Sequence, residues 1–345
     1  MLTFISCAKT MTEKTPTVLP TASSPLFIEE ARHIALSMTA YTAGELADML
    51  HVNPQIAART CLQFRTFHDE GATGLPALSA YTGMVFRHIA PQDFTAEDWA
   101  YAQSHLFITS FLYGLLRPAD RIRNYRLEGH VRLPEEEDRT LFAYWRARLT
   151  DTFISAIRQQ GGMLVNLASA EMKNLFDWTR VTREVRVITP DFYTYKGGRL
   201  STVVVYAKMC RGEMTRFILK NRIENPEDLK NFEWEGYRFN PRESHDDHWV
   251  FTPGTYPRTR ISRQNPLHPS RGHKKHARRS HIRRAHLSTH FIEIKPHGKP
   301  SQSLPDARNL QDIRRRCSRY GKCRPGKSCP DISRSLSLST RHRKP

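Results

Sequence analysis

The sequence lacks any uninterrupted apolar run approaching the ~20 residues that a membrane-spanning helix requires. Residues 2–5 are apolar, but Lys9 follows so closely that no signal-peptide core can form. Cysteine is sparse in the first 252 residues, where Cys7, Cys61 and Cys210 are odd in number and far apart. This pattern favours reduced thiols over a disulfide framework. We therefore expect a cytoplasmic protein with no membrane partner.

Motifs of several enzyme classes are also missing. The chain has no Ser-His-Asp arrangement, no His-Glu-x-x-His motif and no glycine-rich loop of the kind that cradles phosphates. Hydrolase and nucleotide-triphosphatase functions therefore have no support. The cluster His245-Asp246-Asp247-His248 offers iron ligands, but we interpret it as a solvated loop. We expect no cofactor and no bound metal.

Charge is distributed unevenly along the chain. The net charge is +19, but residues 253–345 hold 24 Lys plus Arg and only 4 Asp plus Glu. Residues 1–252 therefore hold 29 basic and 30 acidic residues, a net charge of −1. The last 93 residues contain no Trp and one Phe, too little apolar surface to offset the entropy of folding. We predict one compact domain over residues 1–252 and a disordered basic tail over residues 253–345.

Two interpretations of the tail stay open. Basic runs such as residues 273–279 would attract phosphate backbones without sequence specificity. The bias toward His, Arg, Ser and Pro, without helical or strand periodicity, is instead typical of translation past a shifted reading frame, which we favour. Cys317, Cys323 and Cys329 are spaced more widely than the Cys pairs of zinc sites.

The element pattern predicts an α/β fold, or a mixed α+β fold, around one sheet. Residues 2–5 and 163–167 are typical of buried strands. Thr42 and Thr95 each begin a capping box, so a helix should follow both. Other expected elements are helices over 26–38, 141–157 and 213–222, a short helix from 225–226, a turn at 196–199, and a closing hairpin of 237–239 with 249–251.

Three further predictions decide how the sheet is built. The helix that begins at Thr95 is expected to continue through Leu112 until Pro118 ends or kinks it. Residues 181–189 alternate in polarity and predict a partly exposed strand. Residues 201–206 are rich in β-branched side chains and predict another strand.

Cationic residues follow several of these strands. Lys9, Lys208 and Arg211 each come shortly after a predicted strand, and Ser169 follows another. Ligands of open α/β sheets bind outside the carboxyl ends of the strands, and helix N-termini favour anions. If the strands are parallel neighbours, the three cations converge on one anion-binding cleft. The alternative is three unrelated loops with solvated charges.

Two other clusters carry charge. Arg117 is predicted at a helix C-terminus, where the helix dipole favours a cation, and Arg126 with Glu128 could form a buried pair or position a phosphate. Residues 42–67 predict a helix, a short turn and a second helix, which could dock in a DNA groove or simply pack. Arg59 and Arg65 are the cations on or after that second helix.

Taken together, these segments resemble the YaaA peroxide stress resistance family over residues 1–252. The motifs occur in the family's order and are Ser6-Cys7-Ala8-Lys9-Thr10, Tyr81-Thr82-Gly83, Leu112-Tyr113-Gly114-Leu115-Leu116-Arg117-Pro118, Tyr125-Arg126-Leu127-Glu128, Asn166-Leu167-Ala168-Ser169, Tyr206-Ala207-Lys208, Arg211-Gly212, Arg216-Phe217-Ile218, Asn221-Arg222 and Glu235-Gly236-Tyr237. Cys7, Met172 and Met209 depart from the family pattern, which has proline, tyrosine and lysine at these places.

The resemblance implies a cytoplasmic bacterial protein that limits oxidative damage when peroxide and free intracellular iron threaten DNA. It also implies the single compact fold known as the cantaloupe fold. DNA binding in the family is associated with a helix-hairpin-helix element, for which residues 42–67 are the candidate, and with a positively charged cleft. The cationic positions carried over are Lys9, Arg117, Arg126, Lys208, Arg211 and Arg216.

We therefore predict a non-enzymatic stress protein that binds double-stranded DNA without sequence specificity and has no obligate protein partner. Its expected DNA or anion contacts are Lys9, Arg59, Arg65, Arg117, Arg126, Lys208, Arg211 and Arg216. The alternative is an enzyme acting on a phosphorylated or carboxylated small molecule in the same cleft. Its candidate working groups are Lys9, Tyr113, Arg126, Glu128 and Lys208.

Overall fold

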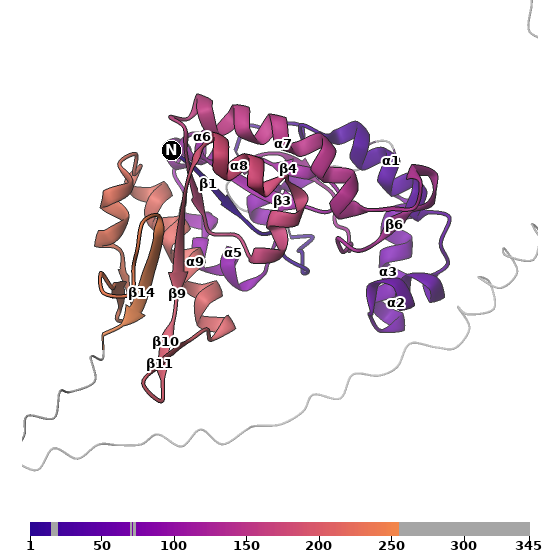
Figure 1. The fold of residues 1–345 in the computed structure, drawn as a ribbon. Helices are drawn as coiled ribbons and strands as arrows, with labels where there is room; N and C mark the ends of the chain where they lie inside the picture. Colours follow the sequence, from indigo (N-terminus) through magenta and orange to yellow (C-terminus); the bar gives the residue numbers. More distant parts are fainter. Residues whose placement is uncertain (15–19, 70, 72–73, 255–345) are drawn as a thin grey trace, which may run out of the picture. The chain divides into compact units, whose positions relative to one another are not determined.

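The computed structural model describes residues 1–14, 20–69, 71 and 74–254, and the predictions made for residues 255–345 lie outside this part of the chain. Its centre is an eight-stranded sheet (Figure 1). In spatial order the strands are β12 (Glu233–Trp234), β13 (Tyr237–Phe239), β14 (His248–Pro253), β9 (Arg186–Phe192), β8 (Met163–Asn166), β1 (Leu2–Ile5), β3 (Leu106–Ser110) and β4 (Gly114–Leu116). The five strands from β14 to β3 are parallel, and antiparallel strands close both edges. The predicted α/β fold around a main sheet is confirmed.

Burial explains why the central strands β1 and β3 are mostly apolar in sequence. Every residue of β1 and of β3 is buried, as expected for parallel strands that are covered on both faces. On one face the Phe4 ring packs edge-on against Phe153 of α7 at 5.3 Å and Phe176 at 6.1 Å. This aromatic cluster fixes β1 in the middle of the sheet.

Helices and small strand pairs surround the sheet (Figure 1). The helices are α1 (Ile28–Met38), α2 (Ala43–Leu50), α3 (Pro54–Arg65), α4 (Ala77–Ala80), α5 (Met84–Ile89), α6 (Ala96–His105), α7 (Leu141–Gln159), α8 (Trp178–Glu184) and α9 (Val204–Asn221). The 3-10 helices are η1 (Pro91–Asp93), η2 (Pro134–Glu136), η3 (Ala170–Leu175) and η4 (Pro226–Asn231). Two-stranded pairs are β2 (Leu75–Pro76) with β5 (Arg121–Ile122), β6 (Arg132–Leu133) with β7 (Arg139–Thr140), and β10 (Thr194–Lys196) with β11 (Arg199–Ser201). No helix in the described part is long and apolar enough to cross a bilayer.

The local signals at helix starts behave as predicted. Thr42 accepts a hydrogen bond from the Glu45 backbone N–H, and the Glu45 carboxylate accepts one from the Thr42 backbone, which completes the capping box of α2. Thr95 and Asp98 do the same for α6. The expected helix–turn–helix at residues 42–67 is therefore present as α2 and α3. The hairpin of β13 with β14 and the turn between β10 and β11 are also confirmed.

The prediction that one helix runs from Thr95 through Leu112 is wrong. Helix α6 ends at His105, and the next five residues form β3, which pairs in parallel with β1. Arg117 consequently follows a strand, β4, and not a helix. A buried apolar run of this length suits a strand or a buried helix equally well, so periodicity alone could not decide. Pairing with β1 decided it.

Two predicted strands are helical in part. Residues 178–184 form α8, which Asp177 caps, and the strand β9 begins only at Arg186. Residues 204–206 open α9, and β11 ends at Ser201. Val204 and Val205 are 58% and 51% exposed, so their β-branched side chains have no neighbouring strand against which to pack. Burial of the following turns of α9 against α5 extends the helix through them.

Candidate functional site

A cleft of about 410 Å³ lies where β1 and β8 end, between these strands and helices α5 and α9. Its lining combines hydroxyl, cationic and apolar side chains and one carboxylate. The lining residues are Ser6, Cys7, Ala8, Lys9, Thr10, Gly83, Met84, Val85, Phe86, Phe111, Leu167, Ser169, Glu171, Met172, Lys208 and Arg211. The convergence of Lys9, Lys208 and Arg211 that the strand-end pattern predicted is therefore present.

The strand ends that form one wall are joined by serine contacts. Strands β1 and β8 are parallel neighbours, which meets the condition set from the sequence for these two strands, and Leu2 lies opposite Leu164. The Ser169 backbone N–H donates a 2.9 Å hydrogen bond to Ser6 Oγ, and the two Oγ atoms lie 3.2 Å apart. These bonds hold the loops that follow β1 and β8 against each other, which fixes the position of the first cleft motif.

Two glycines allow the other wall to approach closely. A Cβ atom on Gly212 of α9 would lie 2.4 Å from the Val85 carbonyl oxygen of α5, a distance that side chains do not adopt. A Cβ on Gly83 would lie 2.6 Å from the Ala8 Cβ. The absence of these side chains brings α9, α5 and the loop after β1 into contact, and thereby places Lys208 and Arg211 beside Lys9.

Lys9 belongs to a charge network with two other predicted residues. Its Nζ lies 2.9 Å from Glu128 Oε1, and the same oxygen lies 2.9 Å from Arg126 Nη2. Arg126 also donates a 3.1 Å hydrogen bond to the Lys9 carbonyl oxygen. The Glu128 side chain is only 7% exposed, whereas the Lys9 side chain is 66% exposed. Arg126 and Glu128 therefore form the buried pair considered from the sequence. Lys9 contacts both residues and also lines the cleft.

The two cations on α9 differ in their surroundings. Lys208 is exposed, and no carboxylate of the described residues pairs with it. Arg211 is 3.8 Å from Asp191, and its Nε atom is buried without a hydrogen-bond partner in the described part. Burial lowers the pKa of the Arg211 guanidinium below its ordinary value. Lys208 is thus the cleft cation most available to an incoming anion.

Cys7 lies in the cleft, in surroundings that disfavour its thiolate form. Burial, followed by the charges of Glu171 and Glu128, raises the pKa of the Cys7 thiol to about 12. A protonated thiol is a weak nucleophile and a weak metal ligand. Thiol chemistry at neutral pH is therefore disfavoured at this position.

Several predicted site residues lie outside the cleft lining. Tyr113 is buried in the core, where its hydroxyl accepts a 2.9 Å hydrogen bond from the Arg123 backbone. Arg117 pairs with the fully buried Asp120 at 3.1 Å. Arg59 on α3 pairs with Glu13 at 2.6 Å.

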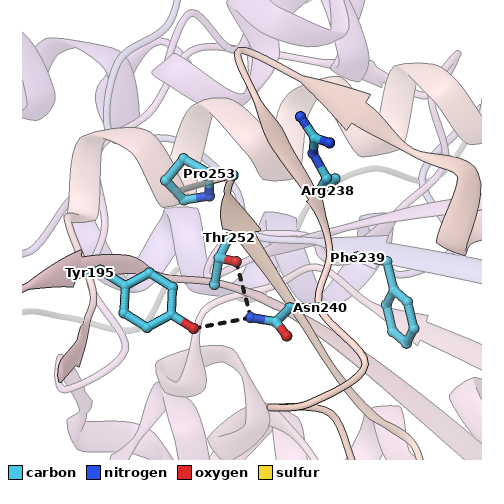
Figure 2. A pocket seen from close by; sticks show the side chains of 7 residues that line it. Tyr195, Arg238, Phe239, Asn240, Thr252 and Pro253 are labelled. Carbon is cyan, nitrogen blue, oxygen red and sulfur yellow. Dashed lines mark hydrogen bonds between the residues drawn. The ribbon is translucent and has the colours of Figure 1, made fainter. Parts of the chain in front are cut away.

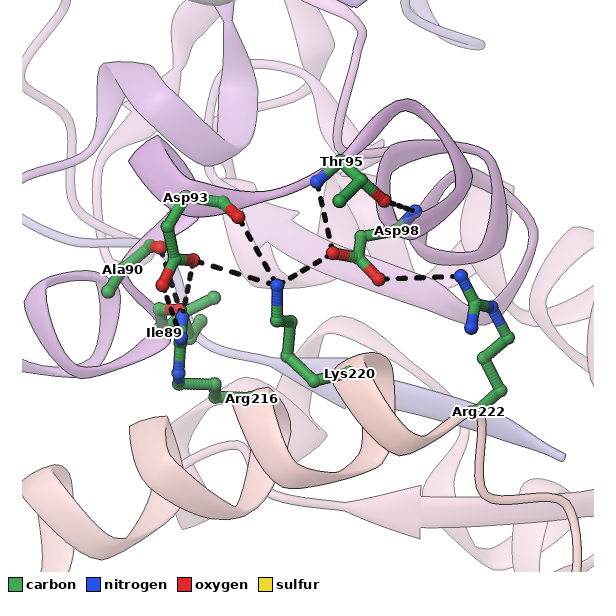
Figure 3. A network of polar contacts seen from close by, with 8 residues as sticks. All are labelled: Ile89, Ala90, Asp93, Thr95, Asp98, Arg216, Lys220 and Arg222. Carbon is green, nitrogen blue, oxygen red and sulfur yellow. Dashed lines mark hydrogen bonds and ion pairs between the residues drawn. The ribbon is translucent and has the colours of Figure 1, made fainter.

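The same holds for Arg65 and Arg216. Arg65, at the end of α3, is exposed and has no carboxylate partner in the described residues. Arg216 belongs to a polar network that joins α9 to the start of α6 (Figure 3). In that network Arg216 binds Asp93, with Nη1 to Oδ1 at 2.8 Å, and Lys220 binds Asp98 at 2.7 Å. These contacts give Arg216 a structural role in helix packing.

Two of the residues considered as iron ligands, Asp247 and His248, have other side-chain partners. Asp247 receives three hydrogen bonds from Arg186, the shortest at 2.8 Å, and His248 Nε2 lies 2.9 Å from Asp191. Among the described residues no group of three or more His, Cys, Asp or Glu side chains is arranged to hold a metal ion.

A second hollow, close to β14, is too small to be a ligand site. Asn240 donates hydrogen bonds to Tyr195 Oη and Thr252 Oγ1 at its centre (Figure 2). The hollow has a volume of about 20 Å³, enough for one water molecule.

Sequence reasoning missed the apolar floor of the cleft. Phe86, Phe111 and Met172 line it and are each less than 5% exposed. The sequence indicated these floor residues only indirectly. Phe86 comes three residues after the family motif Tyr81-Thr82-Gly83, and Met172 is one of the positions that depart from the family pattern. Sequence reasoning also missed Glu171, the carboxylate of the lining.

Comparison with known proteins places this arrangement in a family. Residues 1–243 match the family model described as peroxide stress protein YaaA. A UPF0246 protein of Phocaeicola vulgatus is 57% identical over 252 residues, which cover 73% of this chain and 99% of the relative. UPF0246 proteins of Parabacteroides distasonis and Clostridium beijerinckii are 45% and 35% identical over 73% of this chain and 99% and 97% of the relatives. The resemblance read from the motifs is confirmed, and the chain belongs to the YaaA peroxide stress protein family, UPF0246.

Proposed function

We propose that this protein acts in peroxide stress by binding DNA at the mouth of the cleft, through phosphate contacts from Lys208, Arg211 and Lys9. The observation that carries this proposal is the convergence of three cations from two distant chain segments on one cavity. Phosphate contacts from Lys and Arg position proteins on DNA without reading its sequence.

The local charge balance sets the expected strength of this contact. Glu128 already pairs with Lys9, Asp191 lies near Arg211, and Glu171 also lines the cleft. The cleft can therefore neutralise only one or two phosphates, and the binding it contributes should be weak. Each neutralised phosphate adds about −0.9 to the slope of log affinity against log salt. A fourfold rise in salt should then weaken the contribution of one phosphate by roughly 3.5-fold.

The proposal is tested on the full chain by titration against duplex DNA at several salt concentrations. Lys208→Ala should make the slope less steep by about 0.9, because one phosphate contact is lost. Arg65→Ala is the matched control: it removes an exposed cation from the helix pair α2–α3 that has no carboxylate partner within the described ranges. Both variants keep the basic residues 253–345, so any contribution of that segment cancels in the comparison. An unchanged slope for Lys208→Ala with a reduced slope for Arg65→Ala would transfer the proposal to the helix pair.

Protection from iron follows from the same contacts. DNA carries condensed counterions, and bound protein cations release them. Ferrous ions held at the phosphates would be displaced with the others, so hydroxyl radicals would form farther from the backbone. Plasmid nicking by peroxide and ferrous iron should decrease with the wild-type chain and decrease less with Lys208→Ala. Equal protection by both proteins would show that protection does not depend on DNA binding at the cleft.

An enzymatic function in the same cleft has one observation in its favour. The volume of about 410 Å³ lies within the range of about 300–1,000 Å³ that pockets for small molecules have. Of the candidate working groups, Lys9 and Lys208 line this pocket, Arg126 and Glu128 lie behind Lys9, and Tyr113 is in the core. Turnover of a phosphorylated or carboxylated compound that Lys208→Ala abolishes would favour this alternative.

A further inference from the structure

The dimensions of the cleft limit which part of DNA can enter it. Proteins read a duplex by inserting an element into a groove about 12 Å wide, so the protein part is convex. Here the candidate surface is a cavity of about 410 Å³, which is large enough for a small molecule and far too small for a duplex. A paired duplex can touch only the rim, where Lys9 and Lys208 are exposed.

The polarity of the cleft changes with depth. The exposed cations lie at the rim, whereas the floor is formed by buried aromatic, thioether and aliphatic side chains, Phe86, Phe111, Met172 and Leu167 among them. A site for a bare phosphate gains nothing from an apolar floor. A ligand with an anionic end and a flat apolar body matches both parts.

The carboxylate of Glu171, which lines the cleft, further restricts the class of ligand that fits. Glu171 repels a bare anion, but it can accept hydrogen bonds from an amino group, as carboxylates do from the exocyclic amine of cytosine. The hydroxyl groups of Ser6, Thr10 and Ser169 also line the cleft and are further donors and acceptors. Phosphate, flat ring and amino group occur together in a nucleotide whose base carries an exocyclic amine.

We propose that the cleft binds one unstacked nucleotide, with its phosphate at Lys208 and Arg211 and its base on the apolar floor. The nucleotide is either a free nucleotide or one extruded from a DNA strand. Only binding of the extruded nucleotide rests on the proposed function. Extrusion of one nucleotide is the established way in which proteins bring a base into a pocket, and bases stack on aromatic side chains without strong sequence preference. Single strands and mismatched sites should therefore be preferred over paired DNA.

The test uses the full chain and the fluorescent adenine analogue 2-aminopurine, which stacking quenches. As a free deoxynucleoside monophosphate it should be quenched saturably when it enters the cleft. Deoxyadenosine monophosphate should compete, and both deoxyadenosine and inorganic phosphate should compete at least about tenfold less well, because each lacks one of the two ends of the ligand. Equal competition by inorganic phosphate and the nucleotide would overturn the proposal.

Two substitutions locate the site. Lys208→Ala should weaken nucleotide binding by about tenfold, the lower end of what a hydrogen bond to a charged group contributes. Lys196→Ala is the matched control, because Lys196 is an exposed cation on β10 that does not line the cleft. Val85→Trp should block the floor and abolish binding while Lys208 remains in place. If its thermal unfolding shows that Val85→Trp does not fold, the comparison of the two lysine variants still decides. Equal binding by Lys208→Ala and Lys196→Ala would overturn the assignment.

A duplex with 2-aminopurine opposite a mismatch distinguishes the two sources. Extrusion changes the fluorescence of this duplex when the protein binds, and Lys208→Ala should reduce that change. If DNA binds with the expected salt dependence, but neither the duplex probe nor the free nucleotide responds, the inference fails and the proposed function stands. If the free nucleotide binds and DNA does not, the proposed DNA binding fails and the nucleotide site is supported with a free ligand.

Discussion

The substitution Gly212→Ala tests how the cleft is assembled. A Cβ at this position would lie 2.4 Å from the Val85 carbonyl oxygen and 2.6 Å from the His88 Cβ, both on α5. Nonbonded atoms of this kind rest roughly 3.5–4.0 Å apart, so α5 and α9 would have to separate by on the order of 1 Å. Overpacking of this kind costs about 1–3 kcal/mol, while the better helix propensity of alanine returns about 0.5–1 kcal/mol.

The net loss in the free energy of unfolding should be about 1–2 kcal/mol. For a domain of this size each kcal/mol shifts Tm by about 2–4 °C, so Tm should fall by roughly 2–8 °C. Gly44→Ala in α2 is the matched control, because its Cβ would meet only Thr42 Oγ1, at 3.9 Å. That variant should leave Tm unchanged or raise it by about 1–3 °C.

Urea and thermal denaturation, followed by circular dichroism, measure both variants. The same separation would move Lys208, on α9, away from the cleft, so Gly212→Ala should also weaken nucleotide binding in the native state. A Tm for Gly212→Ala equal to or above that of the wild type would refute the close packing of α5 and α9. A loss of stability with unchanged binding would show that the packing does not position the cleft.

Three further predictions concern other contacts. Although burial disfavours its charged form, hydrogen bonds from Lys220 and from the Thr95 backbone lower the pKa of Asp98 below its ordinary value of 3.8. The stability that Asp98 contributes is therefore fully present above pH 3.8 and is lost as pH falls through the lower folded-state pKa. Asp98→Asn should lower the free energy of unfolding by about 1–3 kcal/mol at neutral pH. It should also make the loss of stability at acidic pH less steep in a pH–stability curve. Gly83→Ala should destabilise the chain by about 1–3 kcal/mol, and Ala8→Gly in the same chain should restore much of it; additive losses in the double-mutant cycle would contradict their direct contact. Because its pKa is about 12, the Cys7 thiol should be alkylated by iodoacetamide at pH 8 far more slowly in the native than in the unfolded chain, as measured by peptide mass spectrometry; equal rates would show that it is accessible as thiolate.

Much of the cleft could be predicted from the sequence because its chemistry sits in short motifs. Lys9 comes four residues after Ile5, the end of the buried strand β1, and Lys208 and Arg211 precede Gly212, the glycine that allows helix contact. The resemblance to the family assigned these motifs to one site before their distances were known. The prediction that a strand ends just before Lys208 was wrong, because these residues begin helix α9. Lys208 and Arg211 nevertheless line the same cleft as Lys9, because the start of α9 reaches the same edge of the sheet.

Other predicted contacts depended on partners that the sequence does not reveal. Arg117 and Arg216 are as basic as Lys208 in the sequence, but Asp120 and Asp93 pair with them in the folded chain. Whether a cation is free for a ligand depends on which carboxylate folding brings within about 4 Å. Composition and spacing contain no information on that distance.

The sequence by itself determined the local elements with strong end signals, the family, and the separation of a near-neutral segment from a basic one. Capping boxes at Thr42 and Thr95 need only residues three positions apart, and charge composition needs no contact at all. Only the tertiary structure decided that residues 106–110 are a strand, that residues 204–206 are helical, and that Lys208 lacks a carboxylate partner among the described residues. These outcomes depend on the pairing of β3 with β1 and on the packing of α9 against α5, which are contacts between segments about 100 or more residues apart.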